Sequence, residues 1–202
     1  MPEQRANKSL HRDKALRRLR VSYAFCCGAR LDRKPETNEN GIMNIWRMKT
    51  HHIDPEGAVA WSRKNGRIAI GWGRVGDITK YKSQSEIKEA IRSCYPVPQY
   101  SNNAHLGAPS LWDLCHTMQK DDLVILSGRA PRELVVEVIG DYRFITEETP
   151  TQTDEGEYYN QRTVRVTEFD PNKLWFAAGQ APGEHRYKTL IKCARSLNLG
   201  EL

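Results

Sequence analysis

The alternation of hydrophobic and polar positions is clearest over residues 67–79, where a strand pattern runs into a glycine-rich turn. Ile68 and Ile70 alternate with smaller or polar neighbours, as one buried face of a β-strand does. Three glycines follow in the turn: Gly71, Gly73 and Gly76. Because glycine permits positive φ angles and close backbone approach, we expect Trp72 beside an open surface that suits a flat ligand. A tryptophan that caps the hydrophobic core would show the same pattern.

Further strand and helix patterns alternate along the chain. Strand patterns cover residues 44–49, 67–72, 123–126, 134–144 and 163–167. Helix patterns, with caps at Asp54, Gly66 and Ser83, cover residues 55–65, 84–94, 109–118 and 187–197. Residues 97–108 and 147–157 are polar and predict loops. This order predicts an α+β domain with a curled, mostly antiparallel sheet or a small β-barrel, and with helices inserted between the early strands.

Positive charge is concentrated near the N-terminus. The net charge of the chain is +6, and residues 1–22 hold seven basic and two acidic side chains, which is a net +5. We therefore divide the chain into a basic arm and linker, residues 1–41, and a folded domain, residues 42–202. Such arms bind nucleic-acid phosphates without reading the sequence, so Arg17, Arg18 and Arg20 are candidate phosphate ligands. A solvated amphipathic helix with no partner is the alternative.

The composition excludes a membrane-spanning helix. Hydrophobic residues make up 39% of the chain and the mean hydropathy is −0.69. No run approaches the roughly 20 apolar residues that a spanning helix needs, and no apolar stretch follows the basic N-terminus as in a secretory signal. We therefore expect a cytoplasmic protein. The five cysteines are scattered without a CxxC pair, which fits reduced thiols better than disulfides or a zinc site.

Several short pieces of the chain occur in an order and spacing that resembles a known family. They are Ile45-Trp46-Arg47, Ile68-Ala69-Ile70-Gly71-Trp72, Gly76-Asp77-Ile78, Tyr95-Pro96, Asn103, Leu111-Trp112, Asp121-Asp122-Leu123-Val124 and Ile139-Gly140-Asp141-Tyr142. Together they resemble the EVE-like branch of the PUA superfamily, closest to the N-terminal domain of Mrr-type and McrB-type restriction proteins and more distantly to the YTH domain. The resemblance covers about residues 43–170 and implies a PUA-like barrel that binds nucleic acid. Several members hold a modified or flipped base in an aromatic pocket.

This chain also departs from that family. The glycine-rich turn that follows the first strand in the restriction-associated branch is replaced here by Lys49-Thr50-His51-His52. Residues 1–41 and the residues beyond Trp175 lie outside the resemblance. We expect no nuclease or nucleotide-hydrolysing domain in this chain, so any cutting would require a separate nuclease or NTPase subunit.

A base pocket of this kind combines aromatic walls with polar groups that contact the base edge. The candidate walls are Trp72, with Trp46 or Trp112 opposite, and Tyr142, and the candidate base-edge groups are Asn103 and Asp77. The candidate ligands of the flanking phosphates are Arg47, Lys49 and Arg74. Asp77 as the cap of a turn and Trp112 as part of a helix core are the structural alternatives.

Enzyme signatures are present only as fragments. Asp77 and residues 86–88 have the letters of a nuclease D…ExK motif, but the ExK part falls at a predicted helix start, where the geometry of a strand is not available. His51, His52 and Asp54 lack a further ligand cluster, and adjacent histidines point in different directions. We therefore expect no catalytic residue, no metal and no cofactor.

The sequence as a whole predicts a non-catalytic module that binds nucleic acid and recognises a modified, methylated base. We expect DNA rather than RNA, with the base flipped into the aromatic pocket, and a role as the specificity part of a restriction or antiviral defence system. Two alternatives stay open. One is an RNA-binding protein of the same fold, and the other is a small hydrolase that acts on nucleic acid or a modified nucleoside.

Overall fold

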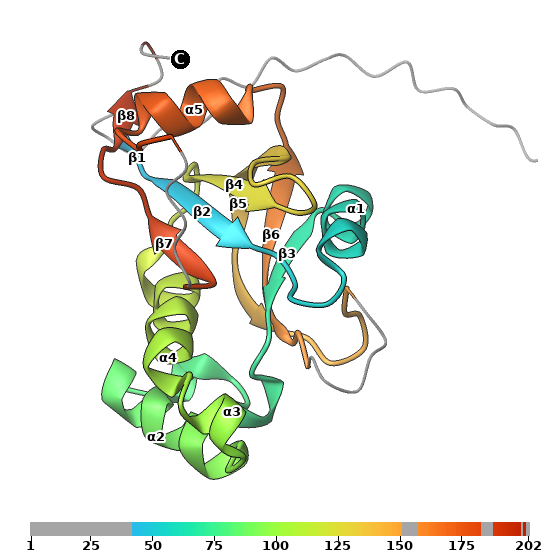
Figure 1. Cartoon of the computed structure of the whole chain (residues 1–202), viewed down its shortest axis with the longest axis vertical. Helices are drawn as coiled ribbons and strands as arrows, with labels where there is room; N and C mark the ends of the chain where they lie inside the picture. The colour runs from blue at the N-terminus through green and yellow to red at the C-terminus, as the bar shows by residue number, and fades with distance from the viewer. Residues whose placement is uncertain (1–41, 151–156, 183–187, 199, 201–202) are drawn as a thin grey trace, which may run out of the picture. The chain divides into compact units, whose positions relative to one another are not determined.

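The computed structural model describes residues 42–150, 157–182, 188–198 and 200, and Figure 1 shows their secondary structure. The predicted basic arm, residues 1–41, lies outside the described residues, and so do Arg17, Arg18 and Arg20. Within the described part, none of the helices has the length and apolar character needed to cross a membrane.

The centre of the fold is a six-stranded sheet whose strands lie in the order β3–β6–β5–β4–β2–β7. Their bounds are β2 Ile45–Lys49, β3 Arg67–Ile70, β4 Leu123–Ser127, β5 Leu134–Phe144, β6 Asn160–Val166 and β7 Leu190–Lys192. Every pair is antiparallel except β2 with β4, which run parallel with Lys49 opposite Ser127. The predicted α+β class and mostly antiparallel sheet are therefore confirmed. Among the described strands the sheet stays open between β3 and β7 and forms no closed barrel.

Helices are inserted between the early strands, as the sequence predicted. They are α1 Pro55–Asn65, α2 Gln84–Cys94, α3 Pro98–Ser101 and α4 Ala104–Trp112, with the short turns η1 Gly73–Val75, η2 Ile78–Lys80 and η3 Asp113–Thr117. Asp54 caps α1 by accepting from the Gly57 N–H at 2.9 Å, and Gly66 ends it with a φ of 62°. In Figure 1, α2, α3 and α4 gather at one end of the sheet.

Two predicted segments differ from the structure. Residues 97–108 were expected to form a loop, but they hold α3 and the first half of α4. Residues 187–197 were expected to form a helix, but their described part holds β7 and the start of β8 Leu197–Asn198, which pairs with β1 Ile42–Met43. The apolar run Leu190-Ile191 is buried against β2, and a run this short fits a strand as well as a helix.

Helix α5 and the first three residues of β6 were not predicted from the sequence. Helix α5 Pro171–Ala177 begins at Asp170, whose Oδ1 accepts from the N–H groups of Asn172 and Lys173 at 2.8 and 3.0 Å. Strand β6 starts three residues before the predicted one. The sequence pattern missed this start because the first three residues of the strand are polar and yet buried: Asn160, Gln161 and Arg162. Their side chains are hydrogen-bonded, which lets a polar stretch lie inside the sheet.

The sheet has a hydrophobic cluster on each face. Trp46 and Met48 on β2 join a large cluster with residues of β3, α2 and α4, whereas Ile45 joins a smaller one with Leu174 and Trp175 of α5. This division follows from the two-residue period of a strand, which sends neighbouring side chains to opposite faces. Strand β4 is buried throughout because both faces are covered where it lies.

Candidate functional site

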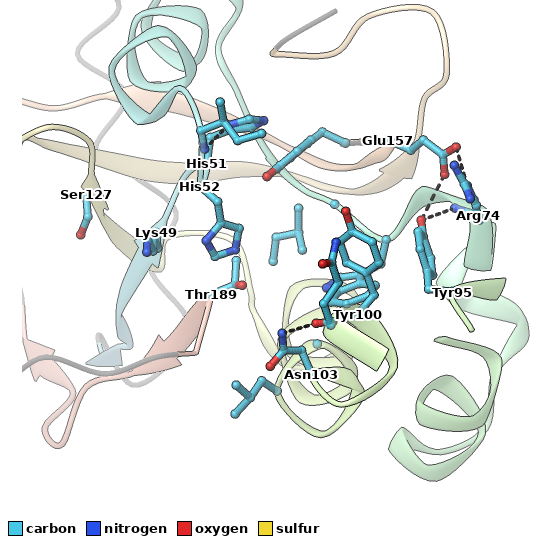
Figure 2. A pocket seen from close by; sticks show the side chains of 18 of the residues that line it. Lys49, His51, His52, Arg74, Tyr95, Tyr100, Asn103, Ser127, Glu157 and Thr189 are labelled. Atoms are coloured by element: carbon cyan, nitrogen blue, oxygen red, sulfur yellow. Dashed lines mark hydrogen bonds and ion pairs between the residues drawn. The ribbon is translucent and has the colours of Figure 1, made fainter. Parts of the chain in front are cut away.

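A cavity of about 1040 Å³ opens where β2 and β4 end and where the chain turns out of β3 (Figure 2). Its aromatic and apolar lining includes Ile53, Ile70, Trp72, Tyr95, Val97, Tyr100, Leu106 and Tyr158. Its charged and polar lining includes Arg47, Lys49, His51, His52, Arg74, Asn103, Ser127, Arg129, Glu157 and Thr189. The cavity therefore combines aromatic surface with four cationic side chains.

The turn after β3 holds Trp72 in an unusual backbone conformation. Trp72 has a φ of 67°, in the left-handed region that bulky residues rarely adopt. The Asn160 Nδ2 donates to the Gly71 carbonyl at 3.1 Å, and the Val75 N–H donates to the Trp72 carbonyl at 3.1 Å. The indole lies close against α4, because a Cβ added at Gly107 would stand 2.7 Å from the Trp72 Nε1. The surrounding structure thus fixes the side chain of Trp72 at the cavity.

Trp72 belongs to a group of three aromatic rings at one end of the cavity. The rings of Trp72 and Tyr95 meet edge to face, with centroids 5.1 Å apart and an interplanar angle of 89°. Tyr100 lies next to Tyr95, with centroids 6.2 Å apart at an angle of 58°. The rings form a corner and not two parallel walls, so a flat ligand would stack on one ring and meet the edge of another.

A carboxylate and a guanidinium are attached to this aromatic end. The Tyr95 hydroxyl donates to Glu157 Oε2 at 3.1 Å and accepts from the Arg74 N–H at 3.0 Å. The Arg74 Nε donates to Glu157 Oε1 at 3.0 Å, and this bond raises the pKa of Arg74. Burial is the main cause of a strongly raised pKa at Tyr95, so its phenol keeps its proton at neutral pH. Glu157 thereby joins the turn after β3 to the end of α2.

The other end of the cavity lies over the ends of the parallel strands β2 and β4. Figure 2 shows Lys49, His52, Ser127 and Thr189 there, away from Tyr95, Arg74 and Glu157. The Arg47 Nε donates to Ser127 Oγ at 3.2 Å, and the pKa of Arg47 is lowered mainly by burial. Together with Arg129 these side chains offer cations and hydroxyl groups, which are common phosphate ligands.

A buried histidine lies on a third part of the lining. His51 is 3% exposed, and its ring lies on Tyr158 with centroids 4.6 Å apart. Its Nδ1 accepts from the N–H groups of Ile53 and Asp54 at 3.1 and 2.9 Å, so this nitrogen carries no proton. Burial lowers the pKa of His51 against the opposing effect of Asp54, and burial also lowers that of His52. Among the described residues, no group of three or more His, Cys, Asp or Glu side chains could hold a metal ion.

Five residues predicted for the site from the sequence line this cavity. They are Trp72, Asn103, Arg47, Lys49 and Arg74. Asn103 is exposed, and its Nδ2 donates to the Gln99 carbonyl at 2.8 Å (Figure 2), which leaves its amide oxygen as the acceptor for a ligand. The guanidinium of Arg74 forms an ion pair with Glu157, so it stabilises the cavity wall in addition to being available to a ligand.

The structure does not bring the other described candidates to the cavity lining. They are Trp46, Trp112, Asp77 and Tyr142. Trp46 is fully buried and donates from Nε1 to Asp122 at 2.8 Å, while Trp112 packs against His116 at 4.2 Å. Both therefore lie in the packing of the fold, and not opposite Trp72.

The two remaining candidates support the turn that carries Trp72. Asp77 Oδ1 accepts from the Thr79 N–H at 2.9 Å and caps η2, as its structural alternative anticipated. The Tyr142 hydroxyl donates to Asn160 Oδ1 at 2.8 Å and accepts from the Ile78 N–H at 3.1 Å. Because Asn160 also donates to the Gly71 carbonyl, Asn160 links Tyr142 to the start of the turn that carries Trp72.

Sequence reasoning missed several lining residues, above all Tyr95, Tyr100, Glu157 and Tyr158. Tyr95 was used only as a piece of the family resemblance and as the residue that follows the predicted helix 84–94, and Tyr100 lay in residues 97–108, which were predicted to form a loop. The usable signal was four aromatic or proline positions within Tyr95-Pro96-Val97-Pro98-Gln99-Tyr100, an unusual density for a surface loop. No local signal places Tyr158 beside His51, because that contact joins residues more than a hundred positions apart.

Comparisons with known proteins give one family match. The family described as "Domain of unknown function (DUF8426)" matches residues 46–172, and no curated protein matches the sequence. The resemblance to EVE-like and restriction-associated domains is tested by neither result and stays a prediction.

Two solved structures are loosely similar in fold. One is described as the YTH domain-containing protein mmi1 and RNA complex, with 12% identity over 78% of this chain and 79% of that chain, at a TM-score of 0.37. The other is described as the Mmi1 YTH domain complex with RNA, with 13% identity over 82% of this chain and 78% of that chain, at a TM-score of 0.36. TM-scores this low support no inference about function.

Proposed function

This chain belongs to the DUF8426 family, whose function is unknown, and from its cavity we propose a non-catalytic module that recognises a modified base in DNA. The observation that carries the proposal is the fixed position of Trp72. A bulky residue is held at a φ of 67° in a cavity that it shares with three tyrosines and four cations. Strained backbone at a ligand-sized cavity is a frequent mark of a binding site.

The aromatic end supports a base as the ligand. A base that leaves a duplex loses stacking worth a few kcal/mol, and an aromatic side chain restores roughly 1–3 kcal/mol per base. Trp72, Tyr95 and Tyr100 offer that surface in one corner. The Asn103 amide oxygen can accept from the base edge, and Glu157 carries further acceptor oxygens beside the same rings.

The cationic end supports a nucleic-acid backbone. Arg47, Lys49 and Arg129 lie along one part of the lining, within the same cavity as the aromatic corner. Contacts with phosphates position a nucleic acid without reading its sequence, so specificity falls to the aromatic end. The predicted phosphate ligands Arg17, Arg18 and Arg20 would add salt-sensitive affinity from the arm.

The shape of the corner supports the proposed preference for a modified base. A methyl group contributes only about 0.8 kcal/mol by apolar burial, so strong discrimination requires a close fit as well. Trp72 and Tyr95 stand nearly perpendicular, which gives an angle into which a methyl group on a stacked base would fit. A separate nuclease or NTPase subunit would supply any cutting in a restriction or defence system.

The test is binding by fluorescence anisotropy to matched DNA duplexes with plain, cytosine-methylated and adenine-methylated sites, at two salt concentrations. A preference for one modified duplex that persists at the higher salt is expected. Trp72→Ala should remove this preference and leave weak, salt-sensitive binding. Trp112→Ala is the matched control, because Trp112 lies off the cavity lining and should keep the preference.

The same experiment separates the alternatives. Equal loss of affinity for plain and modified probes in Trp72→Ala would count against modified-base recognition. Tighter binding to single-stranded RNA of the same sequence would favour the RNA-binding alternative. Release of a base or of shorter fragments from any probe would favour the hydrolase.

A further inference from the structure

Exposed aliphatic side chains stand at the rim of the cavity. Among the described residues, the exposed large hydrophobic side chains are Ile42, Ile53, Val97, Ile139, Val166 and Phe176. Ile53 is 62% exposed, more than any other of this group, and both Ile53 and Val97 line the cavity. Single exposed aliphatic residues are common on protein surfaces, so the surroundings of Ile53 have to show whether its position matters.

The backbone of Ile53 is fixed by buried groups. His51, which is 3% exposed, accepts at Nδ1 from both the Ile53 and Asp54 N–H groups, at 3.1 and 2.9 Å. Asp54 in turn accepts from the Gly57 N–H and caps α1. The His51 ring is itself held against Tyr158. The turn is therefore tied to the buried lining on one side and to a helix on the other, while the Ile53 side chain projects into solvent.

The charge around this turn favours nucleic acid as the partner of the exposed side chain. Arg47, Lys49 and Arg129 line the same cavity as Ile53, and the carboxylate of the next residue, Asp54, is engaged as the cap of α1. An apolar side chain that shares a cavity with cations suits a ligand with phosphates outside and apolar base faces inside. A stacked duplex has this arrangement.

We propose that Ile53 is a wedge that enters the base stack at the position from which the recognised base is turned out. This inference rests on the proposed function and specifies its ligand as a duplex. Extrusion of a base opens a gap between its two neighbours, and an apolar side chain that fills the gap keeps their faces out of water. A rigid turn is suited to this task because little conformational freedom is lost on insertion.

The test compares Ile53→Ala with the unchanged protein on two probes that carry the same modified base. One probe is the DNA duplex and the other is its single strand alone. Ile53→Ala should weaken duplex binding about tenfold, the equivalent of roughly two buried CH₂ groups, and leave single-strand binding unchanged. 2-Aminopurine next to the modified base should brighten on binding of the unchanged protein, because its neighbour leaves the stack, and brighten less with Ile53→Ala.

Ile139→Ala is the matched control, because Ile139 is 43% exposed and lies off the cavity lining. Its affinities for both probes should equal those of the unchanged protein. No change in Ile53→Ala, or the same loss on duplex and single strand, would overturn the wedge. If the wedge is overturned in this way but Trp72→Ala still removes the modified-base preference, the proposed function is kept and only the wedge is lost. If Trp72→Ala keeps the preference, the proposed function fails and the wedge fails with it.

Discussion

Trp46 lies in β2 and Trp72 follows β3, and both belong to or pack against the same hydrophobic cluster. Trp46 is nevertheless part of the interior, whereas Trp72 lines the cavity. Trp46 is fully buried, and its indole N–H meets a buried carboxylate, Asp122, at 2.8 Å. Trp72 is half-buried, with a left-handed backbone and a place in the cavity lining. One tryptophan completes the fold, and the other is held by the fold at a surface that can bind.

The difference lies in the polar surroundings of the two residues and not in their sequence patterns. Asp122 is fully buried and accepts from the Asn44 N–H and Nδ2, the Gln119 N–H and the Trp46 Nε1, at 2.8 to 3.0 Å. The turn at Trp72 is held instead through its backbone, by Asn160. A tryptophan whose N–H is bound to a buried acceptor is committed to the interior, whereas one held by its backbone keeps ring surface for a ligand.

The largest effect that would sharpen this contrast is expected for Asp122→Ala. It leaves four N–H donors without their acceptor, so the free energy of unfolding should fall by about 3–5 kcal/mol. Trp72→Ala should cost less, about 1–2 kcal/mol, because Trp72 is only partly buried and leaves no buried polar group unpaired. Urea unfolding followed by circular dichroism measures both. Asp122→Asn keeps one oxygen acceptor and should fall between them, and a greater loss in Trp72→Ala than in Asp122→Ala would contradict the comparison.

Much of the fold could be predicted from the sequence, because its signals are local. The continuous apolar run of β4, the alternation in β5 and the capping box of α2, where the Ser83 Oγ accepts from the Glu86 N–H at 3.2 Å, are visible within a few residues. The segment 187–197 could not be assigned correctly, because Leu190 and Ile191 become a strand only through pairing with β2. Buried polar residues at the start of β6 misled in the same way.

The candidate site was predictable only where one stretch of chain supplies it. The glycines and the preceding strand pattern predicted the turn at Trp72, and this turn lines the cavity. The choice of Trp46 as an opposite wall was not supported, because residue type does not reveal that Asp122 lies buried beside its indole N–H. Tyr95, Glu157 and Tyr158 come from distant segments, and their meeting depends on packing that no local pattern records.

A second prediction concerns the space that Trp72 needs. In Gly107→Ala the new Cβ would stand 2.7 Å from the Trp72 Nε1 and 2.9 Å from its Cε2, so the indole must move. Overpacking should cost about 1–3 kcal/mol, more than the gain of about 0.5–1 kcal/mol from alanine in a helix. Gly71→Ala is the control, because its Cβ would meet the Tyr158 ring at an ordinary 3.6 Å. Equal stability and unchanged probe binding in Gly107→Ala would show that the indole position is not fixed by α4.

A third, smaller effect is expected for Tyr142→Phe. The hydroxyl accepts from the Ile78 N–H and donates to Asn160, which holds the Gly71 carbonyl. Its removal should lower the free energy of unfolding by about 1 kcal/mol and loosen the turn that carries Trp72. Urea unfolding and anisotropy on the modified duplex measure the two consequences. If stability falls while binding is unchanged, Tyr142 supports the core without positioning Trp72.

The smallest effect is a dependence of stability on pH that comes from a histidine of the cavity lining. Because burial lowers the pKa of His51, the unfolded chain binds a proton more readily than the folded chain does. The contribution of His51 is therefore complete above an unfolded pKa of about 6.5 and is lost as the pH falls toward the folded value. From about pH 7 to about pH 6 the loss should be at most about 0.7 kcal/mol. In His51→Asn the amide oxygen can still accept from Ile53 and Asp54 but cannot titrate, so urea unfolding at the two pH values should show a smaller difference. An undiminished difference would assign the titration to another group, such as His52, whose pKa burial also lowers.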